Sequence, residues 1–295
     1  MSITKQIVGL STFDGIGCCR TGLTRAGIHI GPGNFYTSEI NEDAIGISRF
    51  HYPDNIELGD ICKIDGKPLK GIVNFLAGGS PCQSFSNAGT RSGFDGKSKL
   101  FFEWLRLKNE INPEFWILEN VWMKQKWQDI ISGYLGVQPI FINSKVVSGQ
   151  SRPRLYWTNI PYTPIEDHGI LLGDVVLGAI SGAGRHGKKN TTGVGPNWIQ
   201  GPFEFQPDNK SYCVVTGGGS YKNTQGEIKR FTAEDCEVLQ TLPKGYTGVT
   251  GLSKSRRIIT LGNAWTVDVL VNGFFKNLPF ASESKVQPKG NFLKV

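Results

Sequence analysis

Cys82 lies where the sequence predicts the end of a strand, a place that could hold a reactive side chain. Cys82 follows Gly78-Gly79-Ser80-Pro81, and these residues follow the apolar run 72–77, which is typical of a buried strand. Two glycines and a proline predict a break and a turn at the carboxyl end of that strand. Free cysteine is among the most buried residue types, so the alternative is a structural thiol beside a turn. A nucleophilic role therefore requires partners elsewhere in the chain.

Glu119 is the first candidate partner. Glu119 and Asn120 come directly after the apolar run 115–118, which predicts another buried strand. In a parallel sheet the carboxyl ends of the strands share one edge, so Glu119 and Cys82 could face one pocket. A partly buried carboxyl group there would have a raised pKa and could act as an acid near neutral pH. The alternative is an ion pair with a nearby lysine.

Two arginines form the second candidate. Arg152 and Arg154 are two residues apart within Gln150-Ser151-Arg152-Pro153-Arg154, and on a strand they would project to the same face. Two guanidinium groups on one face suit a phosphate or a pyrimidine oxygen. The alternative is a surface ion pair.

A glycine-containing turn near the start of the chain suggests a nucleoside site. The turn Phe13-Asp14-Gly15-Ile16-Gly17 lies between an expected strand and helix, where glycines let a ligand approach the backbone. A dinucleotide fingerprint would have a third glycine at the position of Arg20. Glu39 and Asp60 follow the next two strands and suit a ribose diol and an adenine amino group. Each acid alone would be read as a solvated residue, but the ordered set predicts an adenosine site without a pyrophosphate clamp.

The elements that must position these residues alternate along the first half of the chain. Apolar strand patterns and helical patterns succeed each other at the spacing of an α/β fold, with a parallel sheet covered by helices on both faces. The expected strands are 7–13, 34–38, 72–77, 115–118, 140–142 and 155–158, and the expected helices are 18–26, 43–51 and 100–110.

The second half of the chain has a different amino-acid composition. Residues 161–229 are rich in Gly, Pro and Asn and predict a loop-rich lobe with a few strands. A helix is expected at 231–242 with Thr232 as N-cap, and an apolar helix toward residue 270 could pack on the first domain. We therefore expect two domains: 1–160 with 257–295, and 161–256.

Composition narrows the class of protein. The 295 residues carry a net charge of +7, which suggests an acidic partner. Six cysteines without a C-x-x-C pair, together with four histidines, argue against a structural zinc site, and no metal is expected. No signal peptide and no apolar run long enough to span a membrane are evident, so we expect reduced thiols and a cytoplasmic location.

Taken together, and in their order along the chain, the motifs resemble those of the cytosine-C5 DNA methyltransferases. Phe13 to Gly17 is similar to the cofactor loop of that family, Gly79 to Gln83 to its Pro-Cys nucleophile loop, and Glu119-Asn120-Val121 to its Glu-Asn-Val motif. Residues 150–154 resemble its Gln-x-Arg-x-Arg motif, and 262–265 resemble its closing cofactor motif. The compact form resembles bacterial and phage members, and the catalytic motifs are also similar to animal de novo DNA methyltransferases.

The resemblance implies a fold and an activity. The fold would be a Rossmann-like sheet that binds S-adenosylmethionine, with a smaller, loop-rich DNA-recognition lobe. The activity would be transfer of the cofactor's methyl group to C5 of a flipped cytosine in duplex DNA, with S-adenosylhomocysteine as product. Cys82 would add to C6, Glu119 would bind the amino group and N3, and Arg154 would hold O2 with Arg152 in support.

The resemblance also implies contact residues. For the cofactor these are Phe13, Asp14, Gly15, Gly17, Glu39, Asp60, Ile61, Gly79, Pro81, Leu100, Asn263, Ala264 and Trp265. For DNA they are Gln83, Ser86 and Arg91, in a loop that would close over the site, and Thr216. Side chains with the right chemistry for base edges are Arg185, His186, Lys188, Lys189, Asn190, Asn223 and Gln225.

Three alternatives stay open at this point. One is a catalytically silent paralogue that binds DNA or a partner enzyme. Another is a tRNA cytosine methyltransferase of the same fold, although the Cys-Phe-Thr signature usual in that family is absent here. A third is a modified form of S-adenosylmethionine as donor. The target sequence, the oligomeric state and the existence of a restriction endonuclease partner are not predicted.

Overall fold

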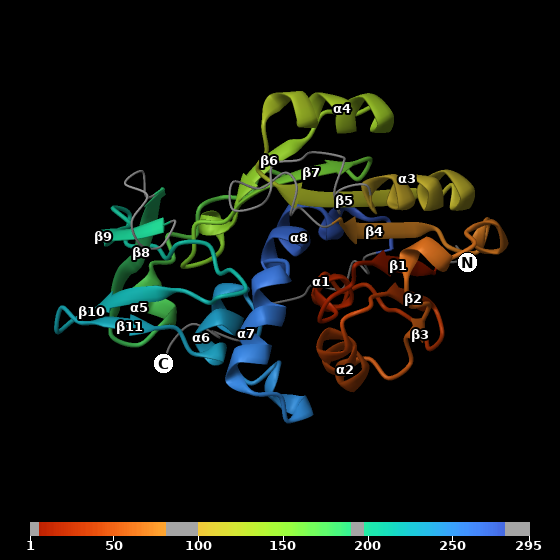
Figure 1. Cartoon of the computed structure of the whole chain (residues 1–295). Coiled ribbons are helices and arrows are strands. Elements are labelled where there is room, and N and C mark those ends of the chain that lie inside the picture. Colours follow the sequence, from red (N-terminus) through yellow and green to blue (C-terminus); the bar gives the residue numbers. More distant parts are fainter. Residues whose placement is uncertain (1–5, 81–99, 190–197, 281–295) are drawn as a thin grey trace.

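The computed structural model describes residues 6–80, 100–189 and 198–280, and the statements below concern those ranges (Figure 1). The larger of two sheets has seven strands in the order β3-β2-β1-β4-β5-β7-β6, and the smaller has four in the order β11-β10-β8-β9. The strands of the larger sheet are β1 (Gly9–Thr12), β2 (Phe35–Ser38), β3 (Ile56–Glu57), β4 (Phe75–Gly79), β5 (Phe115–Val121), β6 (Ile140–Asn143) and β7 (Pro153–Thr158).

Strands β1 to β5 are parallel, so their carboxyl ends lie along one edge of the sheet. In register, Thr12 is opposite both Ser38 and Gly78, and Gly79 is opposite Glu119. The expected α/β fold is confirmed, but the expectation of parallel strands is wrong for β7, which pairs antiparallel with β5 and with β6. The connection 144–152 between β6 and β7 is too short for the helical crossover that a parallel pair needs.

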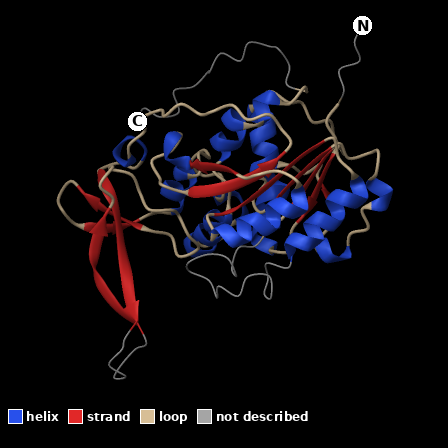
Figure 2. Ribbon diagram, turned by 90° about the horizontal axis from the view of Figure 1, so that it is seen from above, coloured by secondary structure: helices blue, strands red, loops and turns tan. Residues whose placement is uncertain are grey.

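Helices cover both faces of the large sheet (Figure 2). The longer helices of the described chain are α1 (Cys18–Arg25), α2 (Glu42–His51), α3 (Leu100–Ile111), α4 (Gln125–Leu135), α6 (Ala233–Leu239), α7 (Lys254–Asn263) and α8 (Val267–Gly273), of which α7 packs against α2 and α6. Successive residues of β4 serve the two faces, because side chains alternate along a strand. Phe75 packs edge-on against Phe275 with ring centroids 5.7 Å apart. Leu76 belongs to the opposite cluster, with Trp104 of α3.

The smaller sheet stands to one side of the large one (Figure 2). It consists of β8 (Ala179–Lys189), β9 (Trp198–Phe205), β10 (Ser220–Asn223) and β11 (Ile228–Arg230), all paired antiparallel, and short helix α5 (Leu172–Val175) precedes it. The expected strands are present in this part of the chain. The sheets are joined near Ser211, whose N–H donates to Gly149 O at 2.7 Å and whose carbonyl accepts from Ser151 N at 2.9 Å.

Residues 231–247 contact the helices of the large sheet. The expected N-cap is confirmed, because Thr232 and Asp235 form a capping box at the start of α6. Further on, the Tyr246 hydroxyl donates to Ile16 O at 2.9 Å, and its ring stacks on His51 at 3.8 Å. The division of the chain into 1–160 with 257–295 and 161–256 stays a prediction.

The expected apolar helix near the end is two helices. α7 ends at Asn263 and α8 begins at Val267. Taken together, Lys254–Asn277 is long and apolar enough to cross a membrane by length and composition, although the sequence was expected to contain no such run. Its most apolar window is 61% buried within the protein, as in a core helix, and α8 packs against α1.

Candidate active site

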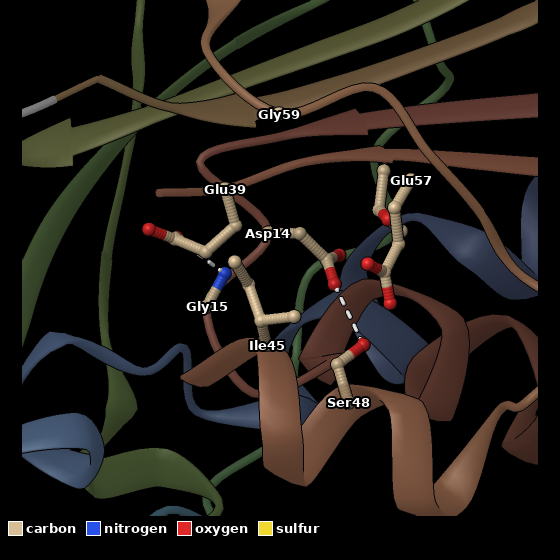
Figure 3. A pocket seen from close by; sticks show the side chains of 8 residues that line it. Asp14, Gly15, Glu39, Ile45, Ser48, Glu57 and Gly59 are labelled. Carbon is tan, nitrogen blue, oxygen red and sulfur yellow. Dashed lines mark hydrogen bonds between the residues drawn. The ribbon is translucent and has the colours of Figure 1, made fainter. Parts of the chain in front are cut away.

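A hollow of about 190 Å³ lies at the carboxyl ends of β1 and β2 (Figure 3). We call it the nucleoside pocket. It is lined by Asp14, Gly15, Thr37, Glu39, Ile45, Ser48, Glu57 and Gly59. Three of these residues are acidic, so the pocket suits a ligand that carries hydrogen-bond donors or positive charge.

The turn from β1 to α1 forms one wall of this pocket. Phe13, Gly15 and Gly17 have φ values of 53°, 60° and 82°, in the left-handed region that favours glycine. A Cβ on Gly17 would lie 3.1 Å from the Tyr52 ring. A Cβ on Gly15 would meet only Phe13 O, at 4.0 Å, so this position presents bare backbone. The predicted close approach of a ligand therefore has room at Gly15.

Asp14 is buried in the pocket wall with an incomplete set of partners. The Ser48 hydroxyl donates to Oδ2 at 3.1 Å (Figure 3). The other oxygen, Oδ1, is buried and has no hydrogen-bond partner among the described residues. Burial raises the pKa of Asp14 to about 7, despite the nearby Ser11 and Ser48 hydroxyls. A buried acceptor without a partner is costly, so a donor in the pocket would satisfy Asp14.

Glu39 closes the turn from the side of β2. Its Oε2 accepts from Gly15 N at 2.9 Å, and Oε1 accepts from Ile40 N at 2.8 Å and Asn41 N at 2.9 Å. The carboxylate therefore fixes the backbone around the pocket as well as lining it. A carboxylate has about four acceptor sites, so Glu39 keeps capacity for a ligand hydroxyl.

Asp60 and Ile61 do not line the pocket. Asp60 caps the 3-10 turn η1 (Ile61–Lys63) by accepting from Cys62 N at 3.0 Å, and Ile61 is buried. Their neighbour Gly59 does line it. The structure therefore brings Asp14, Gly15 and Glu39 together and leaves Asp60 and Ile61 beside them.

A second group of site residues converges on Glu119, near the end of β5. Arg154 Nε lies 2.7 Å from Glu119 Oε1, and Trp265 Nε1 donates to Glu119 Oε2 at 3.1 Å. Glu119 is only 8% exposed. We call Glu119, Arg154 and Trp265 the glutamate cluster. All three are predicted site residues, and in the structure Arg154 and Trp265 each contact Glu119.

Gly78 and Gly79 are part of β4, so the expected break of the chain at these glycines is wrong. A Cβ on Gly78 would lie 2.5 Å from Thr12 Oγ1 and 2.6 Å from the Trp104 indole. A Cβ on Gly79 would lie 2.8 Å from Trp265 Nε1 and 3.1 Å from Glu119 Oε2. Because Gly78 and Gly79 have no side chains, two indoles can approach the strand. Close approach of a neighbouring group is a common reason for glycine in a strand.

Asn120 fixes the residue from which the cysteine loop departs. Its amide Nδ2 donates to Ser80 Oγ at 3.0 Å and to Ser80 O at 3.3 Å, and both residues are buried. Ser80 is the last described residue before the loop. Five predicted site residues lie outside the described residues: Pro81, Cys82, Gln83, Ser86 and Arg91.

Arg152 contacts main chain rather than the glutamate. Its guanidinium donates to Val214 O at 2.8 Å, to Ala264 O at 2.8 Å and to Gly262 O at 3.3 Å. Ala264 is buried and takes part through its main-chain oxygen, whereas Asn263 is exposed. Arg152 therefore holds the segment that carries Trp265, which makes it a positioning residue.

The remaining predicted contacts are dispersed. Leu100 is half-buried at the start of α3, and Thr216 and Gln225 are exposed. Asn223 is buried and accepts from Gln225 N at 3.1 Å and Glu227 N at 2.8 Å, so it builds the β10–β11 turn. Neither Asn190 nor the side chains of Arg185, His186, Lys188 and Lys189 fall within the described part of the chain.

Sequence reasoning missed Ser48, Glu57 and Cys213. Ser48 lies on the buried face of α2, and a polar residue at an apolar helical position could have signalled it. Glu57 lines the pocket and pairs with Arg49 at 2.6 Å, and no local motif marks it. Cys213 lies beside both arginines, and no sequence spacing signals that contact.

The two groups of residues share one sheet edge. β1 and β5 are separated only by β4, and neighbouring strands lie about 4.8 Å apart, so the turn at Asp14 and the end of β5 are roughly 10 Å apart across the sheet. The wall of the nucleoside pocket at Asp14 and the glutamate cluster therefore lie along the same edge of the sheet.

Comparison with known proteins agrees with this arrangement. Residues 7–127 match the family model described as C-5 cytosine-specific DNA methylase. Type II methyltransferase M.Eco47II of Escherichia coli is 40% identical over 114 residues, which are 38% of this chain and 26% of that protein. Orphan methyltransferase M.SPRI of Bacillus phage SPR is 40% identical over 115 residues, with the same shares. The match therefore spans about a quarter of the length of these relatives.

Solved structures share the fold over most of the chain. The methyltransferase EhMeth of Entamoeba histolytica has a TM-score of 0.67 at 17% identity, covering 91% of this chain and 96% of that one. The Dnmt2 methyltransferase of S. pombe has a TM-score of 0.65 at 17% identity, covering 90% and 97%. These likenesses confirm the expected Rossmann-like fold class. The turn at Asp14, the glycine strand β4 and the Glu119 strand β5 all lie inside residues 7–127, the range that matches the C-5 cytosine-specific DNA methylase model.

Proposed function

We propose that this chain is a DNA (cytosine-5-)-methyltransferase that transfers a methyl group from S-adenosylmethionine to C5 of a flipped cytosine in duplex DNA. One observation carries the proposal. Glu119 is buried at the carboxyl edge of the sheet, held by Arg154 and Trp265, beside the strand that leads into Cys82. An acid, a cation and a cysteine loop at one edge suit addition to a pyrimidine ring.

The nucleoside pocket fits the cofactor. S-adenosylmethionine, when bound, would supply an electrophilic methyl group on a positively charged sulfur. Asp14 offers a buried acceptor that has no protein partner among the described residues, and Gly15 offers bare backbone. Asp14 and Glu39 would accept from amino and hydroxyl groups, and Asp60 would accept from the adenine amino group. The other predicted contacts, from Phe13 and Leu100 to Asn263 and Trp265, stay part of this proposal.

The glutamate cluster would handle the cytosine. Cys82, as thiolate, would form a bond to C6, and Glu119 would donate a proton at N3 as charge develops on the ring. Arg154 would hold O2, while Arg152 keeps the Ala264–Trp265 segment in place. Once C5 has taken the methyl group, a base must remove the proton from C5, so that the C5–C6 double bond reforms, the C6–sulfur bond breaks and Cys82 leaves as thiolate, while N3 returns its proton to Glu119.

The site can reach the target cytosine only if that base leaves the stacked bases of the duplex. C5 and C6 are shielded inside duplex DNA, and flipping a base costs about a few kcal/mol. The loop with Gln83, Ser86 and Arg91 would fill the gap, and exposed Thr216 would contact the DNA backbone. The smaller sheet would supply the recognition lobe within 161–256. The relatives reported above are bacterial and phage proteins, which supports the expected cytoplasmic setting.

Transfer of tritium from labelled S-adenosylmethionine into DNA tests the activity. We expect incorporation into duplex DNA of varied sequence, with 5-methylcytosine as the product in nucleoside mass spectrometry. The Cys82→Ser variant should bind DNA about as well as the wild type and abolish turnover, while the exposed Cys62→Ser should match the wild type.

Several outcomes would overturn the proposal. No incorporation by the wild-type protein across varied DNA would refute the activity. Near-normal turnover by Cys82→Ser would refute the role of Cys82. A parallel reaction with total tRNA separates the substrates, because label found only in tRNA would refute DNA as the substrate.

A further inference from the structure

A short stretch of chain, 210–216, contacts both sheets; we call it the linking segment. On one side, Gly182 N of β8 donates to Lys210 O at 2.8 Å. On the other, Val214 N donates to Gln150 Oε1 at 3.1 Å. Gln150 is fully buried. The linking segment is therefore held between the smaller sheet and the residues that precede β7.

Cys213 lies in the middle of this segment and faces the two arginines of the site. Its Sγ is 3.0 Å from Arg152 Nη1 and 3.9 Å from Arg154 Nη2. Although burial acts in the opposite direction, the two guanidinium groups lower the pKa of the Cys213 thiol. A sulfur between two cations is a good acceptor, because a thiolate is stabilised by neighbouring positive charge.

Each nitrogen of the Arg154 guanidinium has a contact. Its Nε faces Glu119 Oε1 at 2.7 Å, Nη1 donates to Pro153 O at 2.8 Å, and Nη2 faces Cys213 Sγ. The guanidinium is planar, so three contacts fix both its position and its plane. Glu119 and Pro153 belong to strands of the large sheet, whereas Cys213 comes from a part of the chain outside that sheet.

We propose that Cys213 is a positioning residue for methyl transfer, whose sulfur holds Arg154 in the plane in which it pairs with Glu119. This inference rests on the proposed function. It gives the recognition side of the molecule a direct contact with the cytosine site, because a shift of the linking segment moves the sulfur that Arg154 contacts. Cys213 itself would form no bond with the substrate, which distinguishes it from Cys82.

The first test compares two substitutions at Cys213. Cys213→Ala removes the acceptor and should lower kcat by about tenfold or more, since small misplacements of site groups have large effects on rate. The KM for S-adenosylmethionine and the melting temperature should stay close to the wild type. Cys213→Ser keeps an acceptor and should restore most of the rate. Cys62→Ala, at an exposed cysteine, is the control.

Two results would overturn the proposal. One is a Cys213→Ala protein that turns over as fast as the wild type. The other is an equal loss of kcat in Cys213→Ser and Cys213→Ala, because the conservative variant would then give no rescue and the role of the sulfur would be packing alone.

A second measurement does not depend on turnover. Iodoacetamide labelling of the ligand-free protein, followed peptide by peptide against pH, should give Cys213 a lower midpoint than Cys62, whose pKa is raised by burial and by Asp60. The charged groups that face Cys213 are Arg152 and Arg154, with Glu119 behind Arg154. Arg154→Met should raise the Cys213 midpoint and leave that of Cys62 unchanged.

The labelling result separates the two proposals. Equal midpoints for the two cysteines in the wild type would contradict the positioning role even if the protein methylates DNA. The expected midpoints in a protein that does not methylate DNA would contradict the proposed function, and the contact between Cys213 and the arginines would stand.

Discussion

Two buried carboxylates lie on one edge of the sheet, and they obtain their partners in opposite ways. Glu119 has a protein partner for each oxygen, Arg154 on one and Trp265 on the other. Asp14 has Ser48 on one oxygen, and its other oxygen has no hydrogen-bond partner among the described residues. Both carboxylate oxygens of the glutamate cluster thus have protein partners, whereas the nucleoside pocket offers an acceptor that a ligand could use.

The two regions also differ in how the chain assembles them. The pocket is built from residues 14–59, within three successive strand units. The glutamate cluster joins residues from positions 119, 154 and 265, which pack against Gly79. A site built from distant segments depends on the whole fold, so substitutions there should affect turnover and stability together. In the pocket the two effects can have opposite signs.

The largest effect is expected in the glutamate cluster. Glu119→Gln removes the proton donor and should lower kcat by about 10²- to 10⁴-fold, the usual contribution of general acid catalysis. Steady-state methylation of DNA measures it. The matched control is Glu110→Gln, which loses a partly buried ion pair with Arg106 at 2.8 Å far from the site. Equal rates in the two variants would contradict the role given to Glu119.

In the nucleoside pocket, Asp14→Asn should weaken cofactor binding and stabilise the ligand-free protein. Losing a hydrogen bond to a charged group costs about 1.5–3 kcal/mol, so affinity for S-adenosylhomocysteine should fall by roughly tenfold or more in calorimetric titration. The gain in stability arises because the amide carries no charge that burial must desolvate.

The way stability depends on pH tests the stability gain expected for Asp14→Asn. Burial raises the pKa of Asp14 from 3.8 to about 7, so between these values the folded protein keeps a proton that the unfolded chain releases. The stability of the wild type should therefore fall as pH rises through this range, and that of Asp14→Asn should fall less. Melting temperatures at pH 5.5 and pH 8 without ligand measure the difference. A wild-type advantage at pH 8 would contradict it.

A smaller effect is expected at Gly262, three residues before Trp265. A Cβ on Gly262 would lie 2.3 Å from both Thr216 N and Val215 C, which are main-chain atoms that cannot move aside singly. Gly262→Ala should therefore destabilise the protein by about 1–3 kcal/mol, as overpacking does. It should also lower kcat, because Trp265 follows closely. Urea unfolding and the methylation assay measure the two effects.

The smallest expected effect comes from the matched control for that substitution. Gly133 is exposed within α4, and a Cβ there would meet no atom within 4 Å. Gly133→Ala should stabilise the protein by about 0.5–1 kcal/mol, since alanine is the better helix former, and should leave methylation unchanged. Destabilisation of both glycine variants to the same degree would show that close packing is not what distinguishes Gly262.

The sequence predicted the nucleoside pocket better than the glutamate cluster. The turn at Gly15 and Gly17 depends on local backbone preferences, which a short stretch of sequence contains, and both glycines have the left-handed φ that such a turn needs. Glu119 and Arg154 were predicted separately from their places on strands, and Trp265 was predicted from motif resemblance alone. Their mutual contacts depend on long-range packing, which no local spacing encodes.

Three features could not be obtained from the sequence for physical reasons. The reversal of β7 follows from a short connection, and apolar patterns alone do not give strand direction. Gly78 and Gly79 read as a turn, because glycine marks turns and close approaches equally well. Arg152 donates to three main-chain carbonyls, which every residue has, and to the sulfur of Cys213, which is distant in sequence.

The paired glycines of β4 have an optical consequence. The end of this strand lies against two indoles, Trp104 at Gly78 and Trp265 at Gly79, and the Trp265 N–H is hydrogen-bonded to Glu119. Among the seven tryptophans of the chain, Trp265 is thus an intrinsic fluorophore in contact with the proposed acid. Its emission depends on the charge and hydration around the indole. Changes at Glu119 can therefore be followed in real time by the difference between the wild-type and Trp265→Phe emission, without an attached dye.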